Sequence, residues 1–280
     1  MVLKKSVTLP DGTKIPALGQ GTWVMGEDST LQQQEITALK LGIEHGLTLI
    51  DTAEMYGNGG AEIVVGKAIK GIRDKVFIVS KVLPINASFQ KTILACNHSL
   101  KRLQIDCLDM YLLHWRGVVP LTETFDAMQT LVEQGKIKRW GVSNFDIKDL
   151  NEVESYVDHH QIMTNQILYN LSRRGIEFDL LPWCRQKGLP CMAYSPIERG
   201  SILSHQSLID IAHKHNATPA QIALAWVLRT DDIIAIPKAS SSEHVIDNIK
   251  SLDIKLTSED LALLDKSFPE PKHKIPLEMH

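Results

Sequence analysis

The fold is decided by residues 47–57, which read Leu-Thr-Leu-Ile-Asp-Thr-Ala-Glu-Met-Tyr-Gly. The first part of this stretch is a short apolar run that predicts a buried strand, and Asp51 stands at its carboxyl end. A phenol, Tyr56, follows five positions later. A lone acidic residue in such a place is usually a helix cap or a hydrogen-bond acceptor in a loop. The interpretation of Asp51 therefore depends on what the other strand ends carry.

The next two predicted strands also end in residues that can do chemistry. Residues 76–81 form an apolar run that ends in Lys81, and residues 108–114 form one that ends in His114. Taken singly, such residues are more often a solvated charge or a satisfied core histidine. Chance does not readily place Asp with Tyr, then Lys, then His on three consecutive strand ends, so we interpret them as one functional set.

From residue 17 onward, apolar runs alternate with helical patterns. The predicted strands cover residues 17–22, 47–51, 76–81, 108–114, 137–142, 162–166, 190–194 and 233–236. A Pro-Asp-Gly turn predicts a β-hairpin over residues 6–16, and an extra helix over residues 257–265 precedes a short tail. Eight apolar strands alternating with helices predict a (β/α)₈ TIM barrel, whose active site lies at the carboxyl ends of the strands. We expect one domain over residues 1–280.

A doubly wound dinucleotide-binding domain is the main alternative architecture. It requires a G-x-G-x-x-G turn after the first strand. Gly19 and Gly21 lack a third glycine in place, and the run that starts at Gly57 fails because position 62 is Glu. The Tyr-x-x-x-Lys spacing of short-chain dehydrogenases is also absent from the sequence.

The composition excludes several classes of partner. The chain has 280 residues, is 44% hydrophobic and carries a formal net charge of -3, without the basic stripe that nucleic acid or a membrane surface requires. No apolar run approaches the roughly 20 residues that span a bilayer, and the amino terminus lacks a secretory core, so we expect a cytoplasmic protein. The four cysteines form no C-x-x-C pair, and we expect no metal site.

Tyr56, Lys81, Asp51 and His114 at one barrel mouth are suited to protonating an oxygen on which negative charge develops. The reference pKa of Tyr is about 10, and we expect the Lys81 ammonium, kept charged by Asp51, to lower it by roughly 1 to 3 units. His114 is suited to point a ring N–H at a carbonyl oxygen. A developing alkoxide also needs a hydride, which no side chain supplies, so a nicotinamide cofactor is expected.

Further strand ends carry groups that suit such a cofactor. Ser143, Asn144 and Gln166 can hydrogen-bond a carboxamide. Tyr194 offers an aromatic face for a nicotinamide ring, and Lys238 is a point charge for a phosphate.

The chain resembles the aldo-keto reductases over nearly its whole length. The residues that carry the resemblance are Gly19-Gln20-Gly21-Thr22-Trp23, Asp51-Thr52-Ala53-Glu54-Met55-Tyr56, Lys81, Leu112-Leu113-His114-Trp115, Gly141-Val142-Ser143-Asn144-Phe145, Asn165-Gln166, Ala193-Tyr194-Ser195-Pro196 and Ile236-Pro237-Lys238. Bacterial members that reduce methylglyoxal and similar small aldehydes are the most similar. The resemblance implies that Tyr56 is the general acid, that Lys81 and Asp51 tune it, and that His114 orients the carbonyl.

The resemblance also implies that NADPH binds extended across the barrel mouth. The implied cofactor residues are Gly21, Thr22, Asp51, Ser143, Asn144, Gln166, Tyr194, Ser195, Lys238, Ser240, His244 and Asn248. Trp23 and Trp115 would line the substrate pocket with Tyr56 and His114, and the tail after Phe268 would form another part of its wall. A monomer is the common state in the family.

One departure from the family concerns the adenosine phosphate. After Ile-Pro-Lys the family commonly has Ser and, five positions later, Arg, whereas this chain has Ala239 and His244. Ser240, Ser241 and the start of the following helix still suit an anion. We expect NADPH to be preferred, with NADH as a weaker alternative.

Two other functions stay open. A non-catalytic member of the same fold would bind NADP(H) as a redox-sensing partner subunit, but the intact set of Asp51, Tyr56, Lys81 and His114 favours an enzyme. A metal-dependent barrel hydrolase is disfavoured because no predicted strand ends in a His-x-His pair. The natural aldehyde or ketone substrate does not follow from the loop sequences.

Overall fold

The computed structural model describes residues 5–157 and 161–280. The chain begins with an antiparallel hairpin of β1 (Ser6–Thr8) and β2 (Lys14–Pro16), in which Val7 lies opposite Ile15. Its turn is held by the amide of Thr13, which donates to the Asp11 carboxylate at 2.9 Å. The hairpin predicted over residues 6–16 is confirmed.

Eight parallel strands follow, and each pairs with its neighbours in chain order from β3 to β10. Their bounds are β3 (Gln20–Gly21), β4 (Leu49–Asp51), β5 (Phe77–Val82), β6 (Met110–Leu113), β7 (Trp140–Ser143), β8 (Ile162–Leu168), β9 (Cys191–Tyr194) and β10 (Ile233–Ala235). Every residue of β4, β6, β7 and β8 is buried, because helices cover one face of the sheet and barrel side chains fill the other.

The sheet closes between its first and last strands. Leu18 forms a parallel bridge with Ala235, and Gly21 forms one with Lys238. The amide of Gly21 donates to the carbonyl of Pro237 at 3.0 Å. The predicted (β/α)₈ barrel with its amino-terminal hairpin is therefore confirmed.

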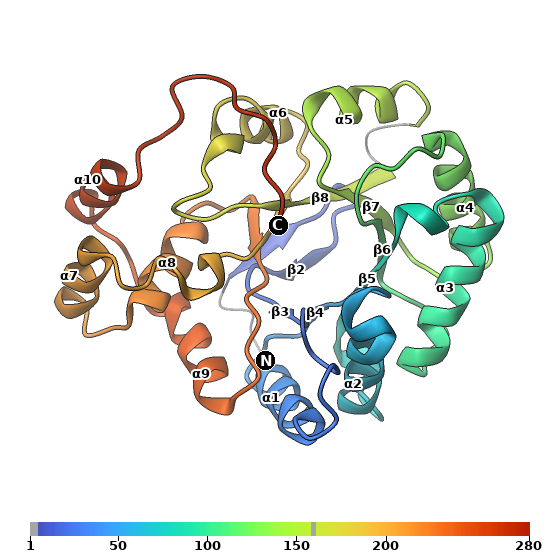
Figure 1. Cartoon of the computed structure of the whole chain (residues 1–280), viewed down its shortest axis with the longest axis horizontal. Coiled ribbons are helices and arrows are strands. Elements are labelled where there is room, and N and C mark those ends of the chain that lie inside the picture. The colour runs from blue at the N-terminus through green and yellow to red at the C-terminus, as the bar shows by residue number, and fades with distance from the viewer. Residues whose placement is uncertain (1–4, 158–160) are drawn as a thin grey trace.

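Helices surround the strands (Figure 1). They are α1 (Gln32–Glu44), α2 (Gly60–Ala68), α3 (Phe89–Leu103), α4 (Leu121–Glu133), α5 (Ile147–Glu154), α6 (Leu180–Gln186), α7 (Gln206–Lys214), α8 (Pro219–Val227), α9 (Ser242–Lys250) and α10 (Ser258–Ser267). Sequence signals at the helix starts are realised, as in α8, where Thr218 and Gln221 form a capping box and Pro219 occupies the first turn. Within the described part of the chain, no helix is long and apolar enough to cross a membrane.

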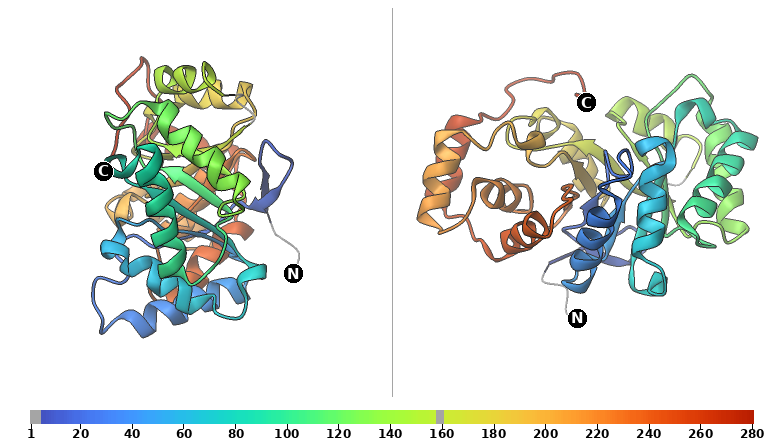
Figure 2. Two further views of the ribbon diagram at one scale, coloured as in Figure 1. Left: turned by 90° about the vertical axis from the view of Figure 1, so that its right-hand side faces the viewer. Right: turned by 60° about the horizontal axis from the view of Figure 1, so that its bottom comes forward.

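The two ends of the barrel differ. Figure 2 shows the hairpin at one end and the end of the tail at the other. The extra helix α10 packs against α7, and the tail after it returns over the barrel (Figure 1). The carboxyl ends of the strands therefore lie beneath the loops and the tail.

The fifth barrel strand differs from its prediction. It was expected over residues 137–142, but β7 begins at Trp140 and ends at Ser143. Ile137 forms only an isolated bridge with Leu108, and the pairing of β7 with β8 shifts register between Trp140 and Val142. Ser143 is therefore the last residue of a strand and not the first residue of a loop.

Candidate active site

A cavity of about 910 Å³ opens at the carboxyl ends of the strands, within the usual size range for a ligand site. It brings together most of the residues singled out from the sequence. These are Gly21, Thr22, Trp23, Asp51, Tyr56, His114, Trp115, Ser143, Asn144, Gln166, Tyr194, Ser195, Lys238, His244 and Asn248. Lys81 lies buried behind Tyr56, and Ser240 also does not line the cavity. The active site of such a barrel lies at the carboxyl ends of its strands, and residues from seven separate strand ends meet in this cavity.

Lys81 is the second-to-last residue of β5, and its side chain is completely buried. Its ammonium donates to the Asp51 carboxylate at 2.7 Å, to the carbonyl of Thr52 at 2.8 Å and to the Tyr56 hydroxyl at 3.3 Å. All three ammonium donors are therefore used. Since the Tyr56 oxygen accepts from Lys81 and no described group accepts from Tyr56, the phenolic hydrogen is free for a ligand in the cavity.

The charges of this cluster differ in part from the prediction. Burial alone would lower the pKa of Lys81, but Asp51 and Tyr56 raise it above its ordinary value, so the ammonium stays charged. Burial raises the pKa of Tyr56, and Lys81 opposes this only in part, while the Asp51 charge adds to it. The expectation that Lys81 and Asp51 lower the pKa of Tyr56 below 10 is wrong, because desolvation of the phenolate outweighs the effect of the ammonium.

His114 follows β6 directly and packs edge-on against Tyr56, with ring centroids 5.7 Å apart. Burial and the nearby Lys81 charge lower the pKa of His114 to about 2, so the imidazole is neutral. Its Nδ1 is buried and has no partner among the described residues. Nδ1 stays unpaired in either neutral tautomer, so a hydrogen bond from His114 to a ligand in the cavity would come from Nε2.

Asn144 ties three strand ends together. It adopts a left-handed backbone conformation with φ of 58°. Its amide nitrogen donates to the carbonyl of His114 and to the Ser143 hydroxyl, both at 3.1 Å. Its side-chain oxygen accepts from the Tyr194 hydroxyl at 3.0 Å. These contacts position the Tyr194 ring in the cavity wall.

Gln166 lies in β8, and among the described residues only the nitrogen of its side-chain amide has partners. The Nε2 atom donates to the Asp51 carboxylate at 2.7 Å and contacts the Met192 sulfur at 3.0 Å. The Oε1 atom accepts from no described residue, so it is a free acceptor at the cavity. Ser143 donates to the carbonyl of Gln166 at 2.9 Å and thereby joins the same cluster.

The amino end of α9 and Lys238 form one edge of the cavity, which Asp247 also lines. Ser241 caps the helix by accepting from the amide of His244 at 3.3 Å. Lys238 is exposed, donates to the Ser240 hydroxyl at 3.1 Å and pairs with no acidic side chain in the described ranges. Buried Asn248 completes this edge. A helix start with a lysine and no acidic partner suits a phosphate.

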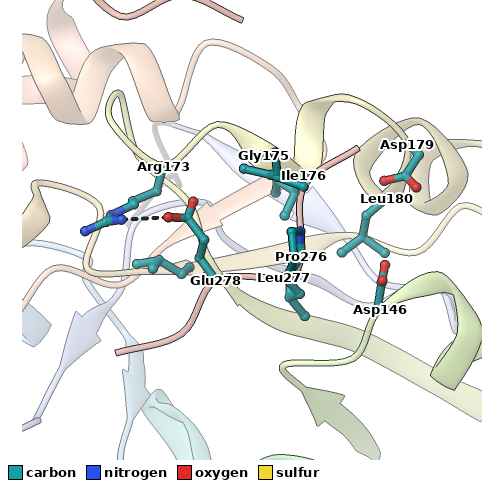
Figure 3. Close-up of a pocket in the computed structure, with 11 residues that line it drawn as sticks. Asp146, Arg173, Gly175, Ile176, Asp179, Leu180, Pro276, Leu277 and Glu278 are labelled. Carbon is teal, nitrogen blue, oxygen red and sulfur yellow. Dashed lines mark hydrogen bonds and ion pairs between the residues drawn. The ribbon is translucent and has the colours of Figure 1, made fainter. Parts of the chain in front are cut away.

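Ion pairs hold the tail against the barrel. Lys274 lies 3.0 Å from Asp146 and 3.0 Å from Asp179. The Arg173 guanidinium donates to the Glu278 carboxylate at 2.6 Å. Figure 3 shows this pair beside a small pocket beneath the tail. The contacts bring the end of the tail to the mouth, where Met279 and His280 line the large cavity, as expected for a tail that forms part of the wall.

Sequence reasoning missed the loop after β9. Ile197, Arg199, Gly200 and Leu203 from this loop all line the cavity. The Arg199 guanidinium lies over the Trp23 ring, 4.2 Å from its centroid. Its position in the sequence could have indicated its place in the cavity wall, since residues that directly follow a barrel strand lie at the active-site end. Among the described residues, no group of three or more His, Cys, Asp or Glu could hold a metal ion.

The closed barrel and the proton-donating groups at its mouth define a class of barrel oxidoreductase. Residues 17–268 match the aldo/keto reductase family, and the chain belongs to this family of enzymes. It is 51% identical to the methylglyoxal reductase YeaE of Escherichia coli, over 99% of each chain. It is 34% identical to a glyoxal reductase of Bacillus subtilis, over 94% of this chain and 92% of that one.

A solved structure is similarly close. The crystal structure of an aldo-keto reductase from Klebsiella pneumoniae in complex with NADPH is 52% identical, with a TM-score of 0.96 and full coverage of both chains. The observed fold is therefore that of a solved family member.

Proposed function

We propose that this protein reduces aldehydes to alcohols with NADPH, acting on methylglyoxal and on other small or aromatic carbonyls. The observation that carries the proposal is the Tyr56 hydroxyl, which accepts from Lys81 and keeps its own hydrogen free at the cavity. The names of the Escherichia coli and Bacillus subtilis relatives, which are methylglyoxal and glyoxal reductases, support the substrate class.

The cavity fits NADPH by the chemistry of its donors and acceptors. The free Oε1 of Gln166 suits the carboxamide N–H groups, and the Tyr194 ring suits the nicotinamide face. Lys238 and the amino end of α9 suit the phosphate groups. The similar solved structure from Klebsiella pneumoniae contains NADPH. When bound, the cofactor supplies the hydride that no side chain can provide.

Tyr56 then acts as the general acid. As negative charge develops on the carbonyl oxygen, the phenol donates its proton, which typically contributes about 10²- to 10⁴-fold to the rate. The charged Lys81, 3.3 Å away, stabilises the phenolate that remains. Asp51 holds Lys81 in place through the contact at 2.7 Å. Neutral His114 donates its Nε2 hydrogen to the same carbonyl oxygen and orients it.

The decisive experiment follows NADPH absorbance with methylglyoxal and with an aromatic aldehyde. We expect wild-type turnover, and a loss of kcat of at least about 100-fold in Tyr56→Phe because the proton donor is removed. The dissociation constant of NADPH should change less than about twofold. Tyr156→Phe, which alters an exposed tyrosine on the outside, is the matched control and should behave as wild type.

Two outcomes would count against this assignment. Full activity in Tyr56→Phe would remove Tyr56 from the chemistry. A wild type that binds NADPH but reduces no carbonyl across a wide panel would favour the redox-sensing alternative.

A further inference from the structure

Glu54 stands two residues before Tyr56 and is half-buried, yet it does not line the cavity. One oxygen of its carboxylate, Oε1, accepts from the backbone amide of Leu83 at 2.7 Å and from the side-chain amide of Asn86 at 3.0 Å. Both donors belong to the segment that follows β5, the strand that contains Lys81. Glu54 therefore joins the loop of Tyr56 to the strand of Lys81.

These hydrogen bonds continue the pairing of β4 with β5 beyond the last residue of β4. The backbone amide of Glu54 donates to the carbonyl of Lys81 at 3.4 Å, and the amide of Leu83 donates to the Glu54 carboxylate. In a parallel ladder a residue donates to the residue before its partner and accepts from the residue after it. Glu54 is thus bonded as if it were paired with Val82, with a carboxylate oxygen in the place of its own carbonyl.

The use of the side chain as acceptor allows the backbone to turn away from the sheet while it stays attached to β5. Met55 has helical φ and ψ angles of -72° and -31°, and the amide of Tyr56 donates to the carbonyl of Ala53 at 3.2 Å. This turn brings the Tyr56 hydroxyl to 3.3 Å from the Lys81 ammonium. That distance is slightly longer than usual for a hydrogen bond, so a small movement of the turn would break the contact.

The groups that bind Glu54 are themselves held in place. The amide of Asn86 donates to the carbonyl of Leu83 at 2.8 Å, and its carbonyl accepts from the Thr92 hydroxyl at 3.1 Å. Thr92 is a buried residue of α3. Glu54 therefore ties the turn that carries Tyr56 to a segment fixed against both β5 and α3.

We propose that Glu54 is a positioning residue for carbonyl reduction, which holds Tyr56 at hydrogen-bond distance from Lys81. The proposal rests on the reductase function above, in which Tyr56 donates its proton to the carbonyl oxygen. Because Glu54 does not line the cavity, its loss should slow the chemical step and leave the binding of cofactor and substrate nearly unchanged. No described residue donates to Oε2, so the oxygen of a glutamine side chain can replace the carboxylate as acceptor for Leu83 and Asn86.

Substitutions at this position test the assignment through the single-turnover rate of NADPH oxidation by methylglyoxal. We expect Glu54→Ala to lower this rate about tenfold, since a small displacement of a catalytic group is costly. Glu54→Asp keeps the charge but shortens the side chain, so it should lose about as much, and it serves alone if the alanine variant does not fold. Glu54→Gln should stay within about threefold of wild type, because it keeps the acceptor.

Binding constants and a control variant complete the experiment. The dissociation constant of NADPH and the methylglyoxal concentration at half-maximal rate should stay within about twofold in all variants, as expected for a residue that acts on the chemical step. Glu123→Ala is the matched control, because the Glu123 carboxylate likewise accepts from a backbone amide, that of Phe89 at 3.3 Å. It should behave as wild type.

Three results would overturn the proposal. An unchanged rate in Glu54→Ala or Glu54→Asp would show that the contact does not position Tyr56. An equal loss in Glu54→Gln would show that the charge matters and not the hydrogen bonds. Weaker binding of NADPH and methylglyoxal at an unchanged maximal rate would show that Glu54 shapes the binding site instead.

If wild type reduces no carbonyl, the reductase function fails first, and NMR decides the role of Glu54 independently. The five tyrosines are labelled with ¹³C at Cζ, and the Tyr56 resonance is identified by its absence from Tyr56→Phe. This carbon responds to hydrogen bonds and charges at the attached oxygen. Its resonance should move in Glu54→Ala and Glu54→Asp and keep its wild-type position in Glu54→Gln. A Tyr56 resonance that stays in place in Glu54→Ala would reject the positioning role.

Discussion

At the scale of single residues, the central feature is how Lys81 distributes its three donors. Asp51 and the carbonyl of Thr52 take two of them, and the Tyr56 oxygen takes the third. This geometry orients the phenol even though burial raises its pKa. We therefore propose that Lys81 positions Tyr56 and stabilises the phenolate during the reaction, and does not create a phenolate beforehand.

The pKa shifts predict the pH profile of reduction. In the proposed mechanism the Tyr56 phenol acts in its protonated form, and a pKa above the ordinary value of 10 keeps it protonated until the pH rises past that value. His114, with a pKa of about 2, stays neutral. With saturating NADPH, we expect kcat/KM for a neutral aldehyde to be level from about pH 6 to 9 and to fall only above about 10.

The profile also has a clear contrary result. A fall in kcat/KM with a midpoint between about pH 6 and 8 would show that Tyr56 or His114 titrates near neutrality in the cofactor complex. Stability measured by circular dichroism over the same range serves as the control, because unfolding at high pH would imitate the loss of a proton donor.

At the scale of the elements, we propose that α9 sets the preference between NADPH and NADH. Its capped amino end, with Lys238 nearby, favours an additional phosphate, but His244 stands where the family commonly has Arg. The side chain of His244 is exposed, so a longer cation at this position has room to reach a ligand.

Replacing that histidine gives a test at this scale. We expect wild type to bind NADPH more tightly than NADH. His244→Arg should tighten NADPH about fivefold or more, because a guanidinium forms paired hydrogen bonds with a phosphate. The affinity for NADH, which lacks the phosphate, should stay within about twofold. Fluorescence titration of both cofactors measures these values, and a wild type that prefers NADH would refute the assignment of α9.

At the scale of the whole molecule, the barrel depends on the contact between its first and last strands. A Cβ atom added to Gly21 would lie 2.6 Å from the carbonyl oxygen of Ile236, which is far too close. The backbone bridge from Gly21 to Lys238 occupies the same place. Gly21 is therefore required for closure of the barrel, in addition to its proposed place in the cofactor site.

Unfolding in urea tests closure and domain organisation together. We expect Gly21→Ala to lower the free energy of unfolding by about 1–3 kcal/mol, since the backbone must move apart where the first and last strands meet.

In wild type, circular dichroism and tryptophan fluorescence should follow one transition with the same midpoint, because we propose a single domain over residues 1–280. Two separate midpoints would contradict the single domain, and an unchanged free energy in Gly21→Ala would contradict the role of the contact between the first and last strands.

Local patterns in the sequence determined the architecture and most of the cavity. Alternation of apolar runs and helical periods predicts eight strands, and the barrel rule then places Asp51, Tyr56, His114 and Gln166 at one end. These inferences succeed because periodicity and strand ends are local properties, and because a closed parallel barrel has only one active-site end. The start of β7 was missed, since Ile137 is apolar but pairs only through an isolated bridge.

Tertiary structure alone decided the remaining features. The raised pKa of Tyr56 depends on burial by distant segments, the contact of Arg199 with Trp23 joins loops far apart in the sequence, and the path of the tail to His280 depends on ion pairs such as Arg173 with Glu278. Desolvation and long-range contact are sums over neighbours from the whole chain, and no local pattern carries them. The sequence by itself determined which chemical groups reach the mouth of the barrel, and the packed structure decided their charges, their orientation and their partners.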